Sequence, residues 1–167
     1  IGAPFATSID LGNGNIITGK YPNGGLIIKY SELGDIEYAN ISGERLGLTI
    51  IKSTNDGGYI IGGVSYYYNI IIKYSSDNKI EWSKEIGGGM IAGVDGIVQL
   101  NDGSYVVVLL DWTSRDIDLG NGVVLKHNGN YYNGKLLIKY NSKGEAQYVE
   151  NILENDNRGN GLIVTSD

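Results

Sequence analysis

The residues best suited to chemistry lie in one short stretch, DIDLGNG, at residues 116–122. Asp116 and Asp118 supply oxygen ligands of the kind that Ca²⁺ prefers. Their spacing differs from that of the EF-hand loop, and the related stretch at residues 8–14 has Ser8 in the first position. Asp and Asn side chains also bond to nearby backbone amides in turns, which explains both copies without a metal. We therefore expect a turn and no cofactor here, with Ca²⁺ held by Asp116 and Asp118 as the alternative.

Arrangements typical of enzymes are missing from the sequence. His127 is the only histidine, which excludes a zinc site built from several histidines, and no GxSxG motif marks a serine nucleophile. We expect His127 to be an exposed loop residue. Glu37 and Glu81 recur beside aromatic residues, where we expect solvated charges or partners between sheets and not an acid/base pair. The sequence therefore favours a protein without catalytic activity, and a glycosidase-like enzyme is the third reading.

Aromatic side chains with a polar tip form the other group of candidates. The chain has 13 Tyr against 1 Phe, and Tyr and Trp suit half-exposed surfaces and binding faces. Packing between sheets and over loops explains the same rings without a ligand. If these rings form a binding face, a protein or a carbohydrate is the expected ligand. The candidates are Tyr21, Tyr66, Tyr67, Tyr68, Trp112, His127, Tyr131 and Tyr132.

Composition and charge exclude several classes of partner. The net charge is -6 and no cluster of Lys or Arg compensates locally, so we expect no nucleic acid partner. No stretch approaches the roughly 20 apolar residues that a membrane-spanning helix needs, so we expect no membrane insertion. The chain has no Cys, so any stability outside the cell has to come from packing and not from disulfides.

One sequence pattern occurs three times and predicts β-hairpins. Each copy has an apolar, β-branched run that ends in Lys-Tyr, then a short polar turn and a second run. The copies are LIIKYSELGDIEY, IIIKYSSDNKIEW and LLIKYNSKGEAQY, at residues 26–38, 70–82 and 136–148. Each turn holds a residue that tolerates positive φ, at Gly34, Asn78 and Gly144. The runs at Ile70–Ile72 and Val106–Leu110 are apolar throughout, which predicts strands buried on both faces.

A second hairpin pattern alternates with the first. Asp56 and Asp102 begin equivalent Asp-Gly turns, within residues 49–65 and 96–110. The chain begins with the second half of this pattern and ends with its first half, GLIVTSD. The order is therefore three strands, two groups of four, and a final single strand. A four-stranded antiparallel unit that recurs every 40 to 45 residues or so is typical of a β-propeller blade.

These motifs resemble the bacterial seven-bladed-propeller-type repeats. The matching segments are Asp10–Gly14, Asp118–Gly122, Lys29-Tyr30, Lys73-Tyr74, Lys139-Tyr140 and KIEWSKEIGG at 79–88. The chain departs from that pattern because it has three units, because the middle unit lacks the DLGNG insert, and because two outer strands carry Tyr instead of Trp. The resemblance implies an all-β propeller fold and an extracellular or cell-surface protein of bacterial type. It implies no shared catalytic residues.

The expected organisation is a single β-propeller domain or fragment with one blade split between the two ends of the chain. The blades are expected at residues 1–43, 44–88 and 93–152, with an orphan inner strand at 159–167. Three blades are too few for a ring of the usual four to eight, so either a longer polypeptide or head-to-tail association of copies completes it. The candidate assembly edges are Ala3, Phe5, Thr7, Leu162, Ile163 and Val164.

Two functions remain open at this point. We expect a non-catalytic, extracellular binding module whose long connections between strands lie on one face, because antiparallel strands bring equivalent connections to the same end. The alternative is a structural protein that assembles into a ring or a filament through the split blade.

Overall fold

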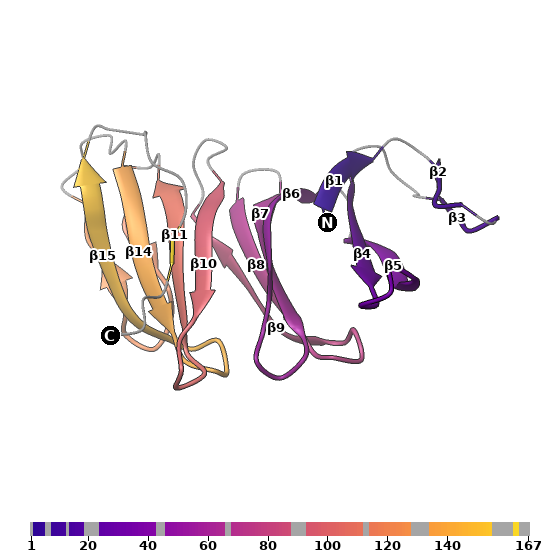
Figure 1. Ribbon diagram of the computed structural model, residues 1–167. Coiled ribbons are helices and arrows are strands. Elements are labelled where there is room, and N and C mark those ends of the chain that lie inside the picture. Colours follow the sequence, from indigo (N-terminus) through magenta and orange to yellow (C-terminus); the bar gives the residue numbers. More distant parts are fainter. Residues whose placement is uncertain are drawn as a thin grey trace.

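The computed structural model shows an all-β protein (Figure 1). It describes residues 2–5, 8–12, 14–18, 24–42, 46–65, 68–87, 93–111, 114–127, 134–154 and 162–163, and none of these lies in a helix. A helix able to cross a membrane is therefore not found among them. The strands are β1 (Gly2–Phe5), β2 (Ser8–Asp10), β3 (Ile16–Thr18), β4 (Gly24–Tyr30), β5 (Ile36–Ser42), β6 (Leu46–Ser53), β7 (Tyr59–Ser65), β8 (Tyr68–Tyr74), β9 (Ile80–Ile86), β10 (Val94–Gln99), β11 (Tyr105–Asp111), β12 (Ile117–Asp118), β13 (Val124–Leu125), β14 (Gly134–Tyr140) and β15 (Ala146–Glu154).

The strands form three main antiparallel sheets, which follow one another along the chain (Figure 1). Sheet 1 has the order β1-β4-β5, sheet 2 the order β6-β7-β8-β9, and sheet 3 the order β10-β11-β14-β15. Two short hairpins are inserted in the connections between paired strands. The hairpin β2-β3 lies in the chain between β1 and β4 of sheet 1, and β12-β13 lies between β11 and β14 of sheet 3. The predicted groups of three, four and four strands are confirmed, whereas Leu162 and Ile163, the described part of the predicted final strand, lie in no strand.

The turns have the conformations that their residues predict. Gly34, Asn78 and Gly144 have φ values of 88°, 64° and 76° in the β4-β5, β8-β9 and β14-β15 turns. In the other hairpins, the carboxylate oxygen of Asp56 accepts a hydrogen bond from the Gly58 amide at 3.0 Å. Asp102 accepts one from the backbone amide of the residue two positions later, at 2.9 Å. All these turns lie at one end of the sheets, which we call the turn end and which is the lower end in Figure 1.

The core consists of two apolar clusters, one between each pair of consecutive sheets. Successive residues of a strand point to opposite faces, so Ile60 and Ile71 of sheet 2 pack toward sheet 3. Ile61 and Ile72 pack toward sheet 1, against Ile27. The middle strands of sheet 2 are therefore buried on both faces, as their unbroken apolar runs predict. Burial of this apolar surface is the main favourable term that holds the sheets together.

Sheets 2 and 3 approach each other closely beside Gly62. A Cβ atom added there would lie 2.7 Å from Cβ of Val94 in β10, so only glycine fits. The β6-β7 register also shifts between Leu48 and Ile50, opposite the same glycine. Thr49, the residue within this shift, donates its hydroxyl hydrogen to the Val94 carbonyl at 2.8 Å. The close approach and the bulge are thus two parts of one contact between sheets.

Candidate binding site

A cavity of about 350 Å³ lies at the connection end, the end opposite the tight turns. It lies between the rim of sheet 2 and the inserted hairpin β12-β13. Tyr68 is the first residue of β8, and Gly87 directly follows β9. The hairpin contributes the other wall. The lining residues are Tyr68, Glu85, Gly87, Arg115, Asp116, Ile117 and Asp118.

The floor of the cavity is anchored and its polar groups are accessible. Ile117 is buried in the core cluster between sheets 2 and 3, so the hairpin cannot move independently of them. Tyr68 is 42% exposed, which leaves part of its ring accessible to a ligand. Glu85 and Arg115 are exposed as well. The site therefore combines an accessible aromatic ring with charged groups on a fixed support.

Asp118 has a structural role in the turn of the inserted hairpin. Its carboxylate accepts a hydrogen bond from the Gly120 amide at 2.8 Å. In the related hairpin β2-β3, Asp10 accepts the same bond from the Gly12 amide, also at 2.8 Å. The same bond therefore forms in a hairpin that does not line this cavity. The predicted turn role of the repeated motif is confirmed in both hairpins.

Asp116 lies at the base of the same hairpin and is held by two donors. One carboxylate oxygen forms an ion pair with Lys126 Nζ at 2.5 Å. The other accepts a hydrogen bond from the His127 backbone amide at 2.9 Å. The hydrogen bond from Lys126, followed by that from His127, lowers the pKa of Asp116, so the carboxylate is charged at neutral pH. Among the described residues, no three His, Cys, Asp or Glu side chains are grouped to hold a metal ion.

The structure brings only some of the sequence candidates together. Tyr68, Asp116 and Asp118 line one cavity. His127 is half-buried instead of exposed, because the segment after β13 bonds back to Asp116. No pattern in the sequence singles out Glu85 or Arg115 as site residues, although both line the cavity. The candidates outside the described residues are Tyr21, Tyr66, Tyr67, Trp112, Tyr131 and Tyr132.

The candidate assembly edges are described in part. Ala3 and Phe5 lie in β1, which is an edge strand because it comes first in the order β1-β4-β5 of sheet 1. Leu162 is half-buried and Ile163 is exposed. Thr7 and Val164 lie outside the described residues.

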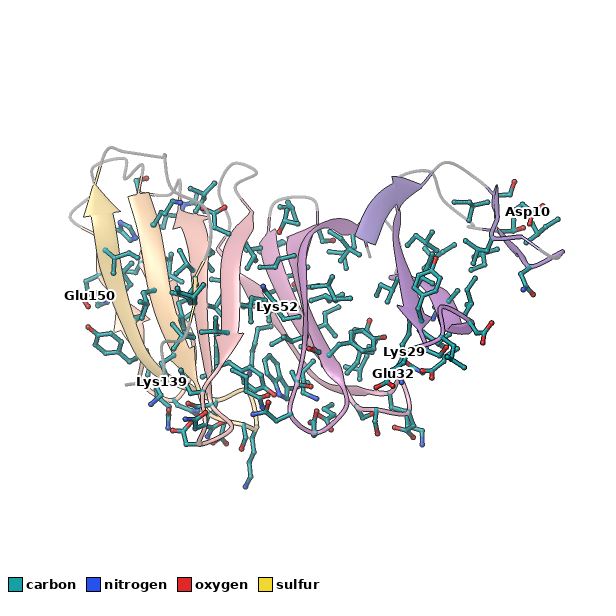
Figure 2. The ribbon with its side chains drawn as sticks, viewed as in Figure 1. Asp10, Lys29, Glu32, Lys52, Lys139 and Glu150 are labelled. Carbon is teal, nitrogen blue, oxygen red and sulfur yellow. The ribbon has the colours of Figure 1, made fainter. Side chains whose placement is uncertain are left out.

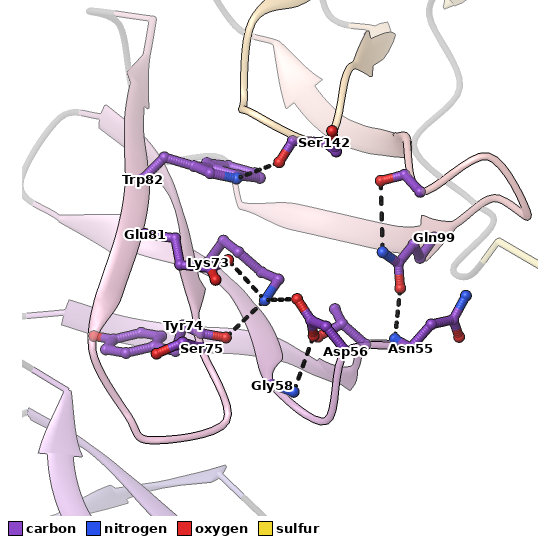
Figure 3. A network of polar contacts seen from close by, with 12 residues as sticks. Asn55, Asp56, Gly58, Lys73, Tyr74, Ser75, Glu81, Trp82, Gln99 and Ser142 are labelled. Atoms are coloured by element: carbon purple, nitrogen blue, oxygen red, sulfur yellow. Dashed lines mark hydrogen bonds and ion pairs between the residues drawn. The ribbon is translucent and has the colours of Figure 1, made fainter.

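The turn end carries a second polar group, a network around Lys73 (Figure 3). The Lys73 ammonium is 1% exposed and lies 2.8 Å from Asp56 and 3.0 Å from Glu81. It also donates a hydrogen bond to the Tyr74 carbonyl at 2.8 Å. Glu81 thus pairs within its own sheet, as Glu37 does with Lys29 at 2.9 Å. The two glutamates are 41% and 44% exposed, as expected for solvated charges, and among the described residues neither pairs with a neighbouring sheet. A register shift between Lys73 and Tyr74 accompanies this contact.

The charge of Lys73 changes the acidity of its neighbours. Burial raises the pKa of Asp56, but the hydrogen bonds from Lys73, Thr54 and Gly58 outweigh it and lower the pKa to about 2. Burial, and then the charges of Asp56 and Glu81, raise the pKa of Tyr105 in the next sheet to about 12. Every donor of the ammonium is satisfied within the protein, so this network stabilises the fold and does not present a reactive group.

Comparisons with known proteins add no family to this picture. No model of a known protein family matches the chain, and no curated protein matches it either.

Proposed function

We propose that the chain is part of an extracellular β-propeller that binds a glycan in the cavity at its connection end, without catalysis. The propeller is supported by three consecutive antiparallel sheets that pack face to face, two of them with four strands in chain order apart from an inserted hairpin. The location outside the cell, or on its surface, rests on the resemblance to propeller repeats.

One observation carries the proposed ligand class. Tyr68 lies in the same cavity as Glu85, Arg115 and Asp118. Glu85 comes from sheet 2, Asp118 from the inserted hairpin, and Arg115 from the segment just before that hairpin. The face of a sugar ring stacks on an aromatic side chain, while its hydroxyl groups bond to carboxylates and guanidinium groups. A volume of about 350 Å³ is in the range of small-molecule sites, roughly 300 to 1,000 Å³. A saccharide unit satisfies both the apolar and the polar parts of this lining.

The test is a glycan array followed by calorimetric titration of the best ligand. Tyr68→Ala should weaken binding about tenfold, the effect of losing one aromatic contact of roughly 1.4 kcal/mol. Asp118→Asn should weaken it as well, because the charged acceptor in the cavity is lost. Asp10→Asn is the matched control, because Asp10 makes the same turn bond in a hairpin that does not line the cavity.

Three results would contradict the proposal. The first is an array without any bound glycan, and the second is equal loss of binding in the Asp118 and Asp10 variants. The third is release of a shortened sugar from a bound ligand, since a module without catalysis leaves its ligand intact.

A further inference from the structure

The two junctions between consecutive sheets share one construction. At the junction of sheets 2 and 3, the Trp82 ring packs edge-on against Tyr105, with ring centroids 5.5 Å apart, and lies 6.1 Å from the Tyr140 ring. At the junction of sheets 1 and 2, Tyr38 packs in one cluster with Tyr59 and Tyr74. The last two rings stack on each other at 4.7 Å. In each case the outer strand of one sheet places an aromatic ring on a tyrosine pair of the next sheet.

The two ends of the row of sheets expose the two halves of this same junction. Tyr148 of sheet 3 holds the position of Trp82 and is 46% exposed. Tyr30 of sheet 1 holds the position of Tyr140 and is 44% exposed, whereas Tyr140 is fully buried. Ile152 is exposed on the same outer strand as Tyr148. One end of the molecule thus carries the ring, and the other carries the surface on which such a ring packs.

The turn of each receiving sheet fits this arrangement. A Cβ atom added to Gly144 of sheet 3 would lie 2.6 Å from the Trp82 ring, so the ring covers the turn. Trp82 also donates its indole hydrogen to the carbonyl of Ser142 in this turn, at 3.2 Å. Gly34 is the same turn position in sheet 1, and a Cβ atom there would have no neighbour within 4 Å. The place that an incoming ring would cover is therefore open.

The recurring lysines of sheets 1 and 2 have different surroundings. Lys73 of sheet 2 is buried between two carboxylates, and one of them, Asp56, lies in the turn between β6 and β7. Lys29 of sheet 1 is 53% exposed and, among the described residues, pairs with Glu37. The three strands of sheet 1 include no counterpart of β6. Lys29 lies opposite Tyr38 in the β4-β5 register, on the face of sheet 1 that packs on sheet 2. The cavity of about 220 Å³ beside it is lined by β4 and by residues of sheet 2 in the same chain, so it belongs to this internal junction. Figure 2 shows Lys29 in sheet 1 and Lys139 in sheet 3.

We propose that copies of the chain associate head to tail, with the Tyr148 face of sheet 3 in one copy packed on the Tyr30 face of sheet 1 in the next. The contact repeats the geometry of the two junctions inside the chain. It joins two different surfaces, so it produces a ring if the rotation closes and a filament if it does not. Repeat proteins need such covering because each unit buries its apolar faces against its neighbours.

The first measurement is native mass spectrometry of the wild-type chain, with sedimentation velocity over a range of concentrations. We expect particles at discrete multiples of the 18.0 kDa chain. Tyr148→Ser and Tyr30→Ser should each raise the dissociation constant about tenfold or more, because they remove a central aromatic contact. Ile80→Ser is the matched control, since Ile80 is a 59% exposed apolar residue of β9 in sheet 2, which forms neither end of the row.

A mixing experiment separates the head-to-tail contact from any symmetric one. Each variant alone should be monomeric. The Tyr148→Ser copy keeps an intact Tyr30 face and the Tyr30→Ser copy keeps an intact Tyr148 face, so their mixture should form a heterodimer and nothing larger. A symmetric contact would not recover on mixing, and a wild-type chain that stays monomeric at every concentration would also overturn the proposal.

The outcome does not depend on the glycan site. Tyr30 and Tyr148 do not line the cavity that contains Tyr68, so both serine variants should bind glycans as the wild type does. Loss of assembly with retained binding supports the contact, whereas unchanged assembly in both variants overturns it.

Discussion

The two ends of the sheets differ in how much they vary from one sheet to the next. At the turn end, the hairpins are short and their backbone bonds repeat, as in the Ser75–Lys79 and Asn141–Glu145 turns. At the connection end, the segment between the second and third strands is residues 66–67 in sheet 2 and residues 112–133 in sheet 3. Variable loops on a constant scaffold are where binding groups concentrate. This difference supports our proposal that the turn end stabilises the fold and that the connection end binds the ligand.

The largest expected effect is a loss of stability at the turn end. Trp82→Ala should lower the free energy of unfolding by about 3 kcal/mol, because it removes a large ring from the junction of sheets 2 and 3. Tyr148→Ala, at the same repeat position on the open face, should cost about 0.5 kcal/mol or less. Urea unfolding at a concentration where the chain is monomeric measures both. Equal losses of unfolding free energy in the two variants would contradict this. They would mean that an aromatic ring at this repeat position stabilises its own sheet whether or not a neighbouring sheet packs against it.

A second pair of substitutions compares the recurring lysines. Lys73→Met should cost about 2 kcal/mol, because it leaves the carboxylates of Asp56 and Glu81 without the cation between them. Lys29→Met should cost about 0.5 kcal/mol or less, since its ion pair with Glu37 is exposed. Urea unfolding provides the measurement here too. A loss at Lys29 as large as that at Lys73 would show that the exposed pair matters as much as the buried network.

The turn end was predictable from the sequence because its determinants are local. Glycine and asparagine at the turn positions fix positive φ, and the apolar runs beside them fix which strands are buried. The pairing order followed from the repeats, since equivalent segments form equivalent strands. Glu81 is exposed, as the first of the two expectations for it predicts, but its pairing with Lys73 beside a register shift was not predictable, because no residue type announces such a shift.

At the connection end, the sequence predicts single candidate residues but not which of them meet in one cavity. Tyr68, Asp116 and Asp118 were recognised as candidates, but their meeting depends on how the hairpin β12-β13 is anchored by Ile117. That anchor is a tertiary contact between segments far apart in the chain. Glu85 entered the site for the same reason, since its strand carries no pattern that distinguishes it from any solvated glutamate.

The smallest effect concerns pH at the turn end. The pKa of Asp56 is about 2 in the folded chain and 3.8 without perturbation, so the unfolded state binds its proton first as the pH falls. This contribution to stability is complete above about pH 4 and is lost as the pH falls toward 2. Asp56 is nearly half exposed, so solvent screening limits the contribution to about 1 kcal/mol or less.

Asp56→Asn should therefore make stability less dependent on pH in this window, as measured by urea unfolding at pH 7 and pH 3. The dependence of the unfolding free energy on pH should decrease without vanishing, because Asp102 contributes as well. Its pKa is lowered by hydrogen bonds from the Ser104 hydroxyl and then from the Ser104 backbone amide. In a Lys73→Met background the same substitution should change the slope little, since the main donor is already gone. An undiminished slope in Asp56→Asn would show that the Lys73 network does not set the acid stability of this end, and that the turn end is supported by its aromatic junctions alone.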